Sequence, residues 1–474
     1  MSAAAVLGWL VLAALAPGAA HLRAGWRKTG LILLNCYAAG LLALLAVRLS
    51  TDNLLGDLTQ DSWLTGITAG AVVLGVAWFA LIVHSFIVLR PGSLPQAGQV
   101  LVGTFAGLLA VMVVLPFGMV TSYVWTSRNA LNDIFVNEGT EDTPDPQAEQ
   151  TTPRPEDPWA GRTRVNILLI GGDADDNRIG VRTDSMNVAT VDVKTGNTVL
   201  VSLPRNLENV RFRPGTPMAQ HFPNGFRLPP DPGGGRSDLL NSVWEYADAH
   251  PEIFGGKQHQ GPKVLMDTIG YTLGLKVDWY ALVNMWGFAR LIDAIGGVTL
   301  TVEQDVVFGR YNEGLVKAGT RKLKGADAMW YARSRTFSDD FTRMRRQRCV
   351  IGALLDQADP ATVLTRFNRI AGATKELIRT DIPRPMLKHL VPLALQVKNA
   401  KVTSIQFVPP LISTVSPDWA KIRSITEKAI RDSAGGRPTA ATASPESTPK
   451  STKSPKKPKE SDPTKTLTEG CGSL

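Results

Sequence analysis

Two aspartates in this sequence stand where carboxylates could hold a metal ion. Asp173 directly follows an apolar run and Gly171-Gly172, and Asp184 stands in the string Arg182-Thr-Asp-Ser-Met186. Carboxylates at the ends of neighbouring strands suit Mg²⁺, whose shell is completed by waters and phosphate oxygens. Each aspartate could equally cap a turn, which is a common role for this residue. The two aspartates alone leave both interpretations open.

A dense group of arginines is the second feature with chemical potential. From Arg321 to Arg348 there are nine Lys and Arg residues against three Asp. Arg333 and Arg335 alternate, so they would share a face of an extended segment. Arg343, Arg346 and Gln347 would share one face of a helix. Guanidinium groups bind phosphate oxygens in pairs, so this pattern predicts a phosphate clamp.

Aromatic residues are interleaved with these arginines, which argues against a simple solvated face. Trp330, Tyr331 and Phe337 all lie within the basic stretch. Basic and aromatic residues together can also indicate nucleic acid binding. The membrane topology derived below places this region outside the cell, and therefore no nucleic acid partner is expected.

Alternating apolar segments and helical periodicity predict an α/β layered domain that positions these residues. The expected strands are residues 165–170, 186–192, 199–203, 277–283 and 298–302, with a hairpin at Lys194–Asn197. The expected helices are residues 263–275, 284–295, 325–333 and 343–357.

The first 125 residues are mostly apolar and predict a membrane anchor of four helices. Runs at Ala3–Ala20, Leu31–Leu49, Gly66–Leu89 and Val100–Trp125 each approach the ~20 residues that cross a bilayer core. These spans hold no deeply placed Asp, Glu, Lys or Arg, so they predict an anchor and not a transporter. His84 is expected to be a packed residue.

Loop charges set the expected orientation of this anchor. Arg23, Arg27 and Lys28 mark the first loop as cytoplasmic, whereas the second loop carries acidic residues. The chain after Tyr123 would then lie outside the cytoplasm, making the protein a multi-pass membrane protein with an external C-terminal domain.

Composition divides the remaining chain into three parts. Residues 127–163 hold eight acidic residues, three arginines and repeated prolines, and are expected to form an extended linker. Residues 164–432 make one domain of ordinary size. Residues 433–474 are rich in Pro, Ser, Thr and Lys and are expected to be disordered. With residues 1–126 as the anchor, the sequence predicts four regions.

Overall composition and the absence of common motifs exclude several classes of protein. The net charge is +9, with 44% hydrophobic residues, so the chain is not a fully disordered protein. Three cysteines in 474 residues exclude a disulfide scaffold. Cys36, Cys349 and Cys471 were each expected to be packed residues or free thiols. The common P-loop, nucleophile-elbow and zinc-protease motifs are absent.

Taken in order, several short strings resemble the LytR-CpsA-Psr family across most of residues 164–432. They are Asn166–Asp173, Arg182–Met186, Ser202–Arg205, Asn241, Gly296–Val298, Leu323-x-Gly325, Tyr331–Arg335, Asp340-Phe-x-Arg343 and Arg346-Gln347. The resemblance implies a mixed central sheet between helices, with an apolar pocket for a lipid tail. It also implies a membrane-anchored transferase that moves a glycopolymer from a polyprenyl-pyrophosphate carrier onto peptidoglycan, with Mg²⁺ as cofactor. The implied partners are therefore the lipid-linked glycan, peptidoglycan and membrane lipid.

Roles carried over from the family complete the expected site. Asp173 and Asp184 would be the metal carboxylates. The expected pyrophosphate clamp consists of Arg182, Arg205, Arg333, Arg335, Arg343 and Gln347, with Asp340 supporting the arginines. Of these, Asp173, Asp184, Arg205, Arg333 and Arg335 would be the catalytic set. Such a cage would stabilise the negative charge that grows on a pyrophosphate leaving group.

The sequence departs from the family pattern at several positions. Asp175 stands where the family often has Arg, and Asn206 stands where it often has Asp. Residues 214–236 form a long Pro/Gly-rich segment, and four predicted spans replace the usual single anchor. Two other functions stay open at this stage: a phosphohydrolase that uses water as acceptor, and a non-catalytic binding or regulatory protein of the envelope.

Overall fold

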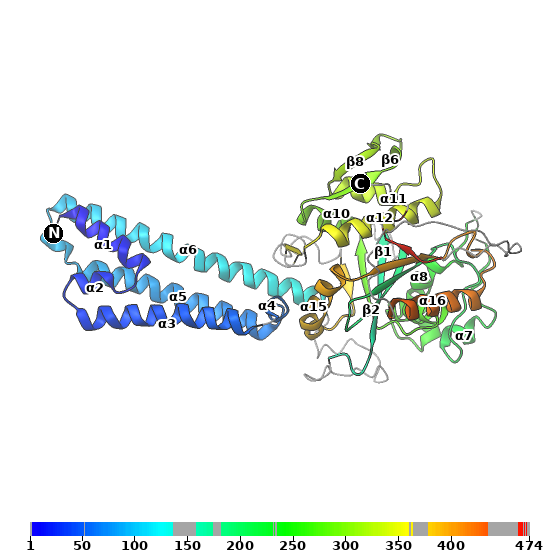
Figure 1. Cartoon of the computed structure of the whole chain (residues 1–474), viewed down its shortest axis with the longest axis horizontal. Coiled ribbons are helices and arrows are strands. Elements are labelled where there is room, and N and C mark those ends of the chain that lie inside the picture. The colour runs from blue at the N-terminus through cyan, green and yellow to red at the C-terminus, as the bar shows by residue number, and fades with distance from the viewer. Residues whose placement is uncertain are drawn as a thin grey trace, which may run out of the picture. The chain divides into compact units, whose positions relative to one another are not determined.

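The chain divides into two compact units, Met1–Asn132 and Asp133–Leu474, in the computed structural model (Figure 1). The structure describes residues 2–51, 53–135, 158–173, 182–230, 232, 235–359, 362–363, 378–434, 463–467, 469 and 471, with the backbone alone for Asp173. Most of the predicted linker and tail, together with Asp175, therefore lies outside the described residues.

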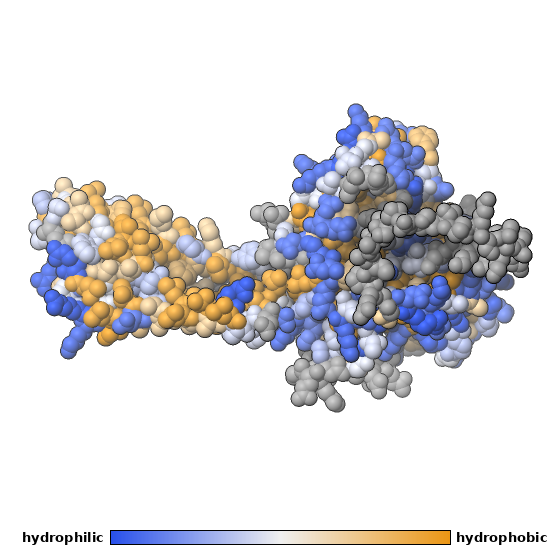
Figure 2. Space-filling view, in the orientation of Figure 1, coloured by the Kyte–Doolittle hydropathy of each residue, from blue (hydrophilic) through white to orange (hydrophobic). Residues whose placement is uncertain are grey.

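The first unit is a set of apolar helices. They are α1 (Ala3–Leu15), α2 (Ala19–Arg23), α3 (Arg27–Ser50), α4 (Leu54–Asp57), α5 (Asp61–Val88), the 3-10 turn η1 (Pro91–Ser93) and α6 (Gln96–Ile134). Three helical segments, Arg27–Ser50, Asp61–Ser93 and Gln96–Ile134, are long and apolar enough to cross a membrane. Figure 2 shows the corresponding hydrophobic surface over these helices.

The prediction of four spans needs a correction at the first helix. The run Ala3–Ala20 breaks after Leu15, so α1 has only 13 residues. At 1.5 Å per residue it is about 20 Å long, which is shorter than a hydrocarbon core of about 30 Å. The indole nitrogen of Trp78 donates to the Ala14 carbonyl oxygen at 3.0 Å and satisfies a group that the break leaves free. His84, expected to be packed, makes a 2.7 Å hydrogen bond with His21.

A mixed seven-stranded sheet organises the second unit, in the order β11-β10-β3-β2-β1-β4-β9. The bounds are β1 Arg164–Asp173, β2 Arg182–Asp192, β3 Thr198–Leu203, β4 Trp279–Asn284, β9 Ile378–Thr380, β10 Val402–Gln406 and β11 Lys465–Thr466. Strands β1 and β4 pair in parallel, as do β3 and β10, while β2 is antiparallel to both its neighbours. The carboxyl ends of β1, β3, β4 and β10 therefore meet at one edge.

The helices and short strands of the second unit surround this sheet. The α-helices are α7 Pro217–His221, α8 Val243–Ala249, α9 Gly261–Leu273, α10 Met285–Ala294, α11 Gly325–Arg333, α12 Asp340–Gln357, α15 Leu387–Lys398 and α16 Trp419–Ala434. The 3-10 helices are η2 Leu240–Ser242, η3 Pro251–Phe254 and η4 Arg384–Met386. Two small antiparallel pairs complete the described part: β5 (Val298–Val302) with β8 (Gly319–Leu323), and β6 (Val306–Phe308) with β7 (Gly314–Val316).

Alternation along the strands separates the two faces of the main sheet. Met186 and Val188 of β2 belong to the main core, which includes residues of α8, α9 and α16. Asn187 lies between them in sequence and accepts a hydrogen bond from Ser202 of β3 at 2.5 Å. Gln406, flanked by the core residues Ile405 and Phe407, donates to the Met344 carbonyl of α12. Helix α12 therefore lies over the face opposite to the main core, which confirms the α/β layered architecture.

A disulfide contradicts the expectation for two of the cysteines. Cys349 of α12 and Cys471 are joined across a sequence separation of 122 residues. Leu467 is buried against α12, where Gly352 leaves room for it, and Arg348 donates to the Glu469 carbonyl. Closing a loop of this length can stabilise a fold by roughly 4–5 kcal/mol in the chain-entropy account. The described end of the tail is thus ordered, because β11 pairs with β10 and the disulfide ties it to α12.

Two other predicted boundaries also move. Helix α6 extends to Ile134, so the segment after residue 126 begins as helix and not as linker. Helix α16 continues to Ala434, beyond the predicted domain end at residue 432. Both differences arise because helical periodicity continues past the change in composition.

A partly buried carboxylate, Asp381, directly follows the edge strand β9, which pairs with β4. Asp381 accepts a 2.7 Å hydrogen bond from the Tyr280 amide. Burial raises the pKa of Asp381 to about 7, and the nearby Asp278 carboxylate adds to the rise. The folded protein therefore holds a proton on Asp381 at a pH where the unfolded chain, with a pKa near 3.9, has lost it.

This difference predicts a pH-dependent stability. Since the folded pKa is raised, the stabilisation is complete below pH 4 and is lost as pH rises toward 7. Asp381→Asn keeps a hydrogen-bond acceptor without the charge, so we expect it to raise the melting temperature at pH 8, by a free energy of about 2–4 kcal/mol. Below pH 4, where Asp381 is protonated in both the folded and the unfolded chain, the variant should melt like the parent. An equal shift at both pH values would contradict the buried-carboxylate explanation.

Candidate functional site

A β-bulge places Asp184 at the carboxyl edge of the sheet. Gly171 of β1 pairs with Ser185 of β2, but the next residue, Gly172, pairs with Thr183. Asp184 is therefore the extra residue that has no partner in the ladder. Bulges redirect a side chain out of the regular alternation and are common next to functional sites. This local irregularity brings the Asp184 carboxylate toward the arginines described next.

Three arginines and two aspartates from separate parts of the chain converge here. Arg205, two residues after β3, pairs with the Asp184 carboxylate and reaches Asp340 with its Nε at 3.2 Å. Arg343 lies 3.1 Å from Asp340 and donates to the Asp184 carbonyl oxygen at 2.9 Å. Arg335 approaches Asp340 at 3.9 Å. We call Asp184, Arg205, Arg335, Asp340 and Arg343 the arginine cluster.

The arginine cluster carries one excess positive charge, because three guanidinium groups face two carboxylates. Arg343 is 3% exposed at its side chain, whereas Arg335 is 52% exposed. Burial lowers the pKa of Arg343, and the neighbouring Arg205 and Arg335 lower it further, against the effect of Asp340 and Asp184. Arginine nevertheless stays protonated in proteins, so the cluster is positively charged. Arg343 carries its charge in the interior, and Arg335 carries its charge at the surface.

Several polar atoms beside the cluster are buried without a hydrogen-bond partner in the described part of the chain. They are Arg343 Nε, Asn206 Oδ1 and Asn241 Oδ1. Asn206 follows Arg205, and the Asn241 amide donates to the Arg205 carbonyl at 3.1 Å. Buried polar groups are usually paired, so unpaired ones indicate a place where a ligand or water completes the network. No periodic pattern in the sequence predicts that the Asn206 and Asn241 side-chain oxygens lie beside the cluster.

Helices α11 and α12 hold the loop that carries Arg335. Gly325 begins α11 where a Cβ would lie 2.0 Å from the Ala289 carbonyl oxygen, so only glycine allows this close packing on α10. Asp339 caps α12 by accepting from the Thr342 amide at 2.6 Å. Between the helices, Phe337 is 85% exposed and has a φ of 56°. Such a conformation is unfavourable for an aromatic residue and is typical of functional loops.

Not all predicted clamp residues join the arginine cluster. Arg182 is exposed and approaches Glu245 of α8 at 3.4 Å. Arg333 ends α11 and its guanidinium lies 5.5 Å from the centre of the Trp330 ring, so Arg333 is helical and the predicted extended segment Arg333–Arg335 does not form. Gln347 donates to the Ala332 carbonyl at 3.3 Å. These contacts give Arg333 and Gln347 places beside the cluster and not within it.

Arg346 was predicted to share a face with Arg343 but makes other contacts. It donates to the Ser334 carbonyl at 3.1 Å and lies over the Tyr331 ring at 5.8 Å. Ser334 in turn donates to the Val307 carbonyl of β6. Arg346 therefore positions the loop before Arg335.

Asp184 and Asp173 are the carboxylates that could contribute to Mg²⁺ binding. The Asp184 carboxylate pairs with Arg205 through one oxygen and is 26% exposed. The backbone of Asp173 pairs with Arg182, two residues before Asp184, while the Asp173 side chain lies outside the described atoms. The described residues contain no group of three or more acidic, His or Cys side chains suited to a metal. One or two carboxylates nevertheless suffice for Mg²⁺ when phosphates supply further oxygens.

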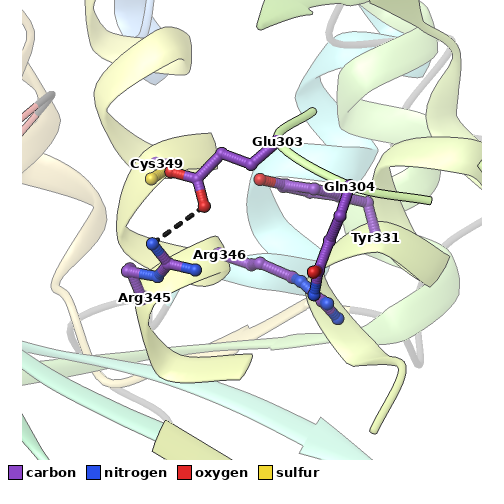
Figure 3. A pocket seen from close by; sticks show the side chains of 6 residues that line it. All are labelled: Glu303, Gln304, Tyr331, Arg345, Arg346 and Cys349. Carbon is purple, nitrogen blue, oxygen red and sulfur yellow. Dashed lines mark ion pairs between the residues drawn. The ribbon is translucent and has the colours of Figure 1, made fainter. Parts of the chain in front are cut away.

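A small cavity beside α12 is separate from the cluster. It measures about 10 Å³ and is lined by Glu303, Gln304, Tyr331, Arg345, Arg346 and Cys349 (Figure 3). A space of this size holds one water molecule at most. In Figure 3, Arg345 points toward Glu303, which it pairs with at 2.8 Å. The cavity is too small for a substrate.

Comparison with known proteins identifies the fold and its motifs. The LytR_cpsA_psr family profile matches residues 134–414, which is more than half of the chain. This protein belongs to the LytR_cpsA_psr family. The matched range includes all predicted site residues and therefore confirms the resemblance seen in the sequence.

Proteins of similar sequence carry names that refer to the cell envelope. A polyisoprenyl-teichoic acid–peptidoglycan teichoic acid transferase, TagU, of Halalkalibacterium halodurans is 29% identical over 46% of this chain and 60% of its own length. The probable cell wall biosynthesis protein LcpB of Corynebacterium glutamicum is 29% identical over 70% of this chain and 69% of its own length. The chain covers about three fifths of the length of the TagU relatives that it matches.

Solved structures are also similar to part of this chain. TagV of Bacillus subtilis covers 58% of this chain and 99% of its own, at 21% identity and a TM-score of 0.40. The protein gbs0355 of Streptococcus agalactiae covers 58% of this chain and 90% of its own, at 20% identity and a TM-score of 0.43.

The contacts of Asp340 predict its importance for stability. Asp340→Asn leaves the buried Arg343 without its nearest carboxylate, and we expect a loss of about 2–4 kcal/mol, because an uncompensated buried charge is costly. Glu303→Gln is the control, since it removes an exposed partner of Arg345 and should cost less than about 1 kcal/mol. Thermal melts of both variants test this expectation. Equal melting temperatures would show that Asp340 does not hold the cluster together.

Proposed function

We propose that this protein transfers a glycopolymer from a polyprenyl-pyrophosphate carrier to peptidoglycan. The observation that carries the proposal is the convergence of Arg205, Arg335 and Arg343 on two aspartates, with net positive charge and an exposed guanidinium. A pyrophosphate has oxygens on both phosphorus atoms, which suit several guanidinium groups at once. The printed function of the TagU relatives, transfer of polyisoprenyl-linked teichoic acid to peptidoglycan, supports the same reaction class.

The proposed step is a phosphoryl transfer in which all atoms balance. A hydroxyl of peptidoglycan attacks the phosphorus that carries the glycan and loses its proton to a base or to solvent. A new P–O bond forms, and the P–O bond to the lipid-bearing phosphate breaks. Polyprenyl phosphate leaves with the bonding electrons, while the glycan stays attached through its phosphate. The cluster stabilises the charge that grows on the leaving phosphate.

Each member of the cluster has a separate part in this proposal. Arg335, the most exposed of its arginines, contacts the phosphate oxygens directly. Arg205 and Arg343 supply positive charge from the more buried side of the cluster, and Asp340 positions all three guanidinium groups. The apolar pocket for the lipid chain, which the family resemblance implies, remains a prediction.

Magnesium is a further part of the proposal. Asp184, together with Asp173, would hold Mg²⁺ against the pyrophosphate, where the ion would neutralise phosphate charge. Because protein ligands are few, the ion should bind mainly together with the substrate.

A transfer assay with the full chain in nanodiscs tests the function. The substrate is a polyprenyl-pyrophosphate-linked glycan, the acceptor is peptidoglycan, and the readouts are linked glycan and released polyprenyl phosphate. Arg335→Ala should lower the rate about 30- to 1000-fold, as expected when a transition-state contact is lost. Arg345→Ala, which removes an exposed arginine of α12 that pairs with Glu303, is the matched control and should keep the parental rate.

The same assay separates the rival functions. Free phosphorylated glycan without linked product would indicate the phosphohydrolase. No turnover by the parent, with intact binding of the lipid-linked glycan, would favour a non-catalytic binding protein. Equal rates for Arg335→Ala and Arg345→Ala would contradict the clamp. If EDTA and Asp184→Asn both leave transfer unchanged, magnesium has no place in the reaction.

We also propose that the anchor is multi-pass and that the second unit lies outside the cytoplasm. The three long apolar segments and the basic loop at Arg23, Arg27 and Lys28 support this arrangement. The Cys349–Cys471 disulfide supports it independently, because disulfides persist in oxidising compartments and are rare in the cytosol.

Cysteine labelling in cells provides the test of topology. Cells are quenched with acid, and the denatured full chain is labelled with a maleimide polymer that shifts its gel mobility. We expect one reactive thiol, Cys36, before reduction and three after it. In Cys36→Ser the expected numbers are zero and two. Three reactive thiols before reduction would place the second unit in the cytoplasm.

A further inference from the structure

A groove of about 540 Å³ lies apart from the arginine cluster, on the side of the domain that contains α7, α9 and α16. It is formed by residues 211–223 together with Tyr271 of α9 and with Trp419 and Arg423 of α16. Its volume is within the range of small-molecule sites, which is about 300–1,000 Å³. Part of its wall belongs to the Pro/Gly-rich segment in which this sequence departs from the family pattern.

Two arginines, Arg211 and Arg423, line this groove, and their guanidinium groups can bind a ligand. No hydrogen bond or ion pair joins the exposed Arg211 to another described residue. Arg423 donates its Nε to the Tyr271 carbonyl at 3.1 Å, and its terminal nitrogens make no ion pair within the described chain. The neighbouring Arg213 differs, because it pairs with Asp267 at 2.6 Å and does not line the groove.

The groove contains no acidic residue among its described lining side chains. Without a carboxylate to neutralise them, Arg211 and Arg423 make the groove a place that favours an anion. Guanidinium groups bind carboxylates and phosphates through paired hydrogen bonds. The groove therefore has an anion-binding component independent of the arginine cluster.

Aromatic rings form the other half of the wall. Phe222, Tyr271 and Trp419 line the groove, and the Arg423 guanidinium lies 4.5 Å from the centre of the Tyr271 ring. Rings offer flat apolar surfaces against which the C–H faces of sugars can pack, while Gln220 offers a hydrogen-bonding amide. Rings beside unpaired arginines suit a ligand with both sugar and acidic groups.

We propose that this groove binds an acidic saccharide chain, carrying either carboxylates or phosphodiesters. The inference rests on the proposed function and adds a second glycan site to it. Arg211 follows Arg205 by six residues, so their Cα atoms are at most about 22 Å apart. One extended glycan can therefore contact the groove while its reacting end is at the arginine cluster. The groove would select the glycan chain. If that chain is the carrier-linked glycan, the cluster would bind its pyrophosphate; if it is the acceptor, the cluster would receive its hydroxyl.

Binding measurements with the full chain in nanodiscs test the groove without requiring turnover. One probe is a muramidase digest of peptidoglycan, which carries carboxylates, and the other is a soluble glycan with phosphodiester links. Neutral dextran is the chemical control. All measurements use the Arg335→Ala background as well as the parent, so that binding at the cluster can be distinguished. The probe that binds identifies the source of the acidic group.

Matched variants connect binding to the groove. Arg211→Ala should weaken binding of the acidic probe at least 10-fold, and Trp419→Phe should weaken it less than Trp419→Ala. Arg227→Ala is the control: this exposed arginine of the same segment donates to Asn209 at 2.7 Å and does not line the groove. It removes the same charge and should leave affinity unchanged. Melting temperatures establish that each variant is folded.

The outcomes separate the two proposals. Binding that depends on Arg211 but persists in Arg335→Ala supports the groove, even if the transfer assay fails. If neither acidic probe binds more tightly than dextran, the groove is not a saccharide site. If Arg227→Ala weakens binding as much as Arg211→Ala, the attraction is general positive charge and the proposal is wrong.

Discussion

The Asp340 carboxylate is the interaction on which the site depends. Arg205, Arg335 and Arg343 come from different parts of the chain, and their like charges repel at close range. One carboxylate at the first turn of α12 lowers that repulsion for all three, while Asp184 contributes from the sheet edge. Because Arg343 is almost fully buried, its charge requires this compensation. Arg335 can then remain exposed, where a ligand can reach it.

The sheet edge and α12 provide the two sides of this arrangement. The bulge at Asp184 turns that carboxylate out of the regular alternation of the strand. The other carboxylate, Asp340, belongs to α12, which lies over the face of the sheet opposite to the main core. The contact from Gln406 to Met344 and the Cys349–Cys471 disulfide both hold α12 in place. The C-terminal segment therefore supports the helix that carries Asp340, although it is far from that residue in sequence.

The two sites that we propose differ in electrostatic construction. In the arginine cluster, carboxylates and guanidinium groups are interleaved, so the positive excess is small and the geometry is fixed. In the groove, Arg211 and Arg423 have no carboxylate partners among the described residues and are combined with aromatic rings. The first arrangement suits a compact pyrophosphate group, while the second suits an extended ligand that combines charge with apolar sugar faces.

Local patterns in the sequence are enough to predict the α/β class, the strand before Gly171-Gly172, the hairpin at Lys194–Asn197 and the residue types of the site. These features follow from local periodicity, turn chemistry and motif order, which the chain carries within short windows. Tertiary packing, in contrast, brings Arg205 and Arg335 together at Asp340, while Arg182 contacts Glu245 and Arg333 contacts Trp330. It also decided the Cys349–Cys471 pairing and the order of the tail end. Partners separated by many residues depend on packing and strand register, and composition or periodicity along the chain does not specify which of several like charges or thiols will meet.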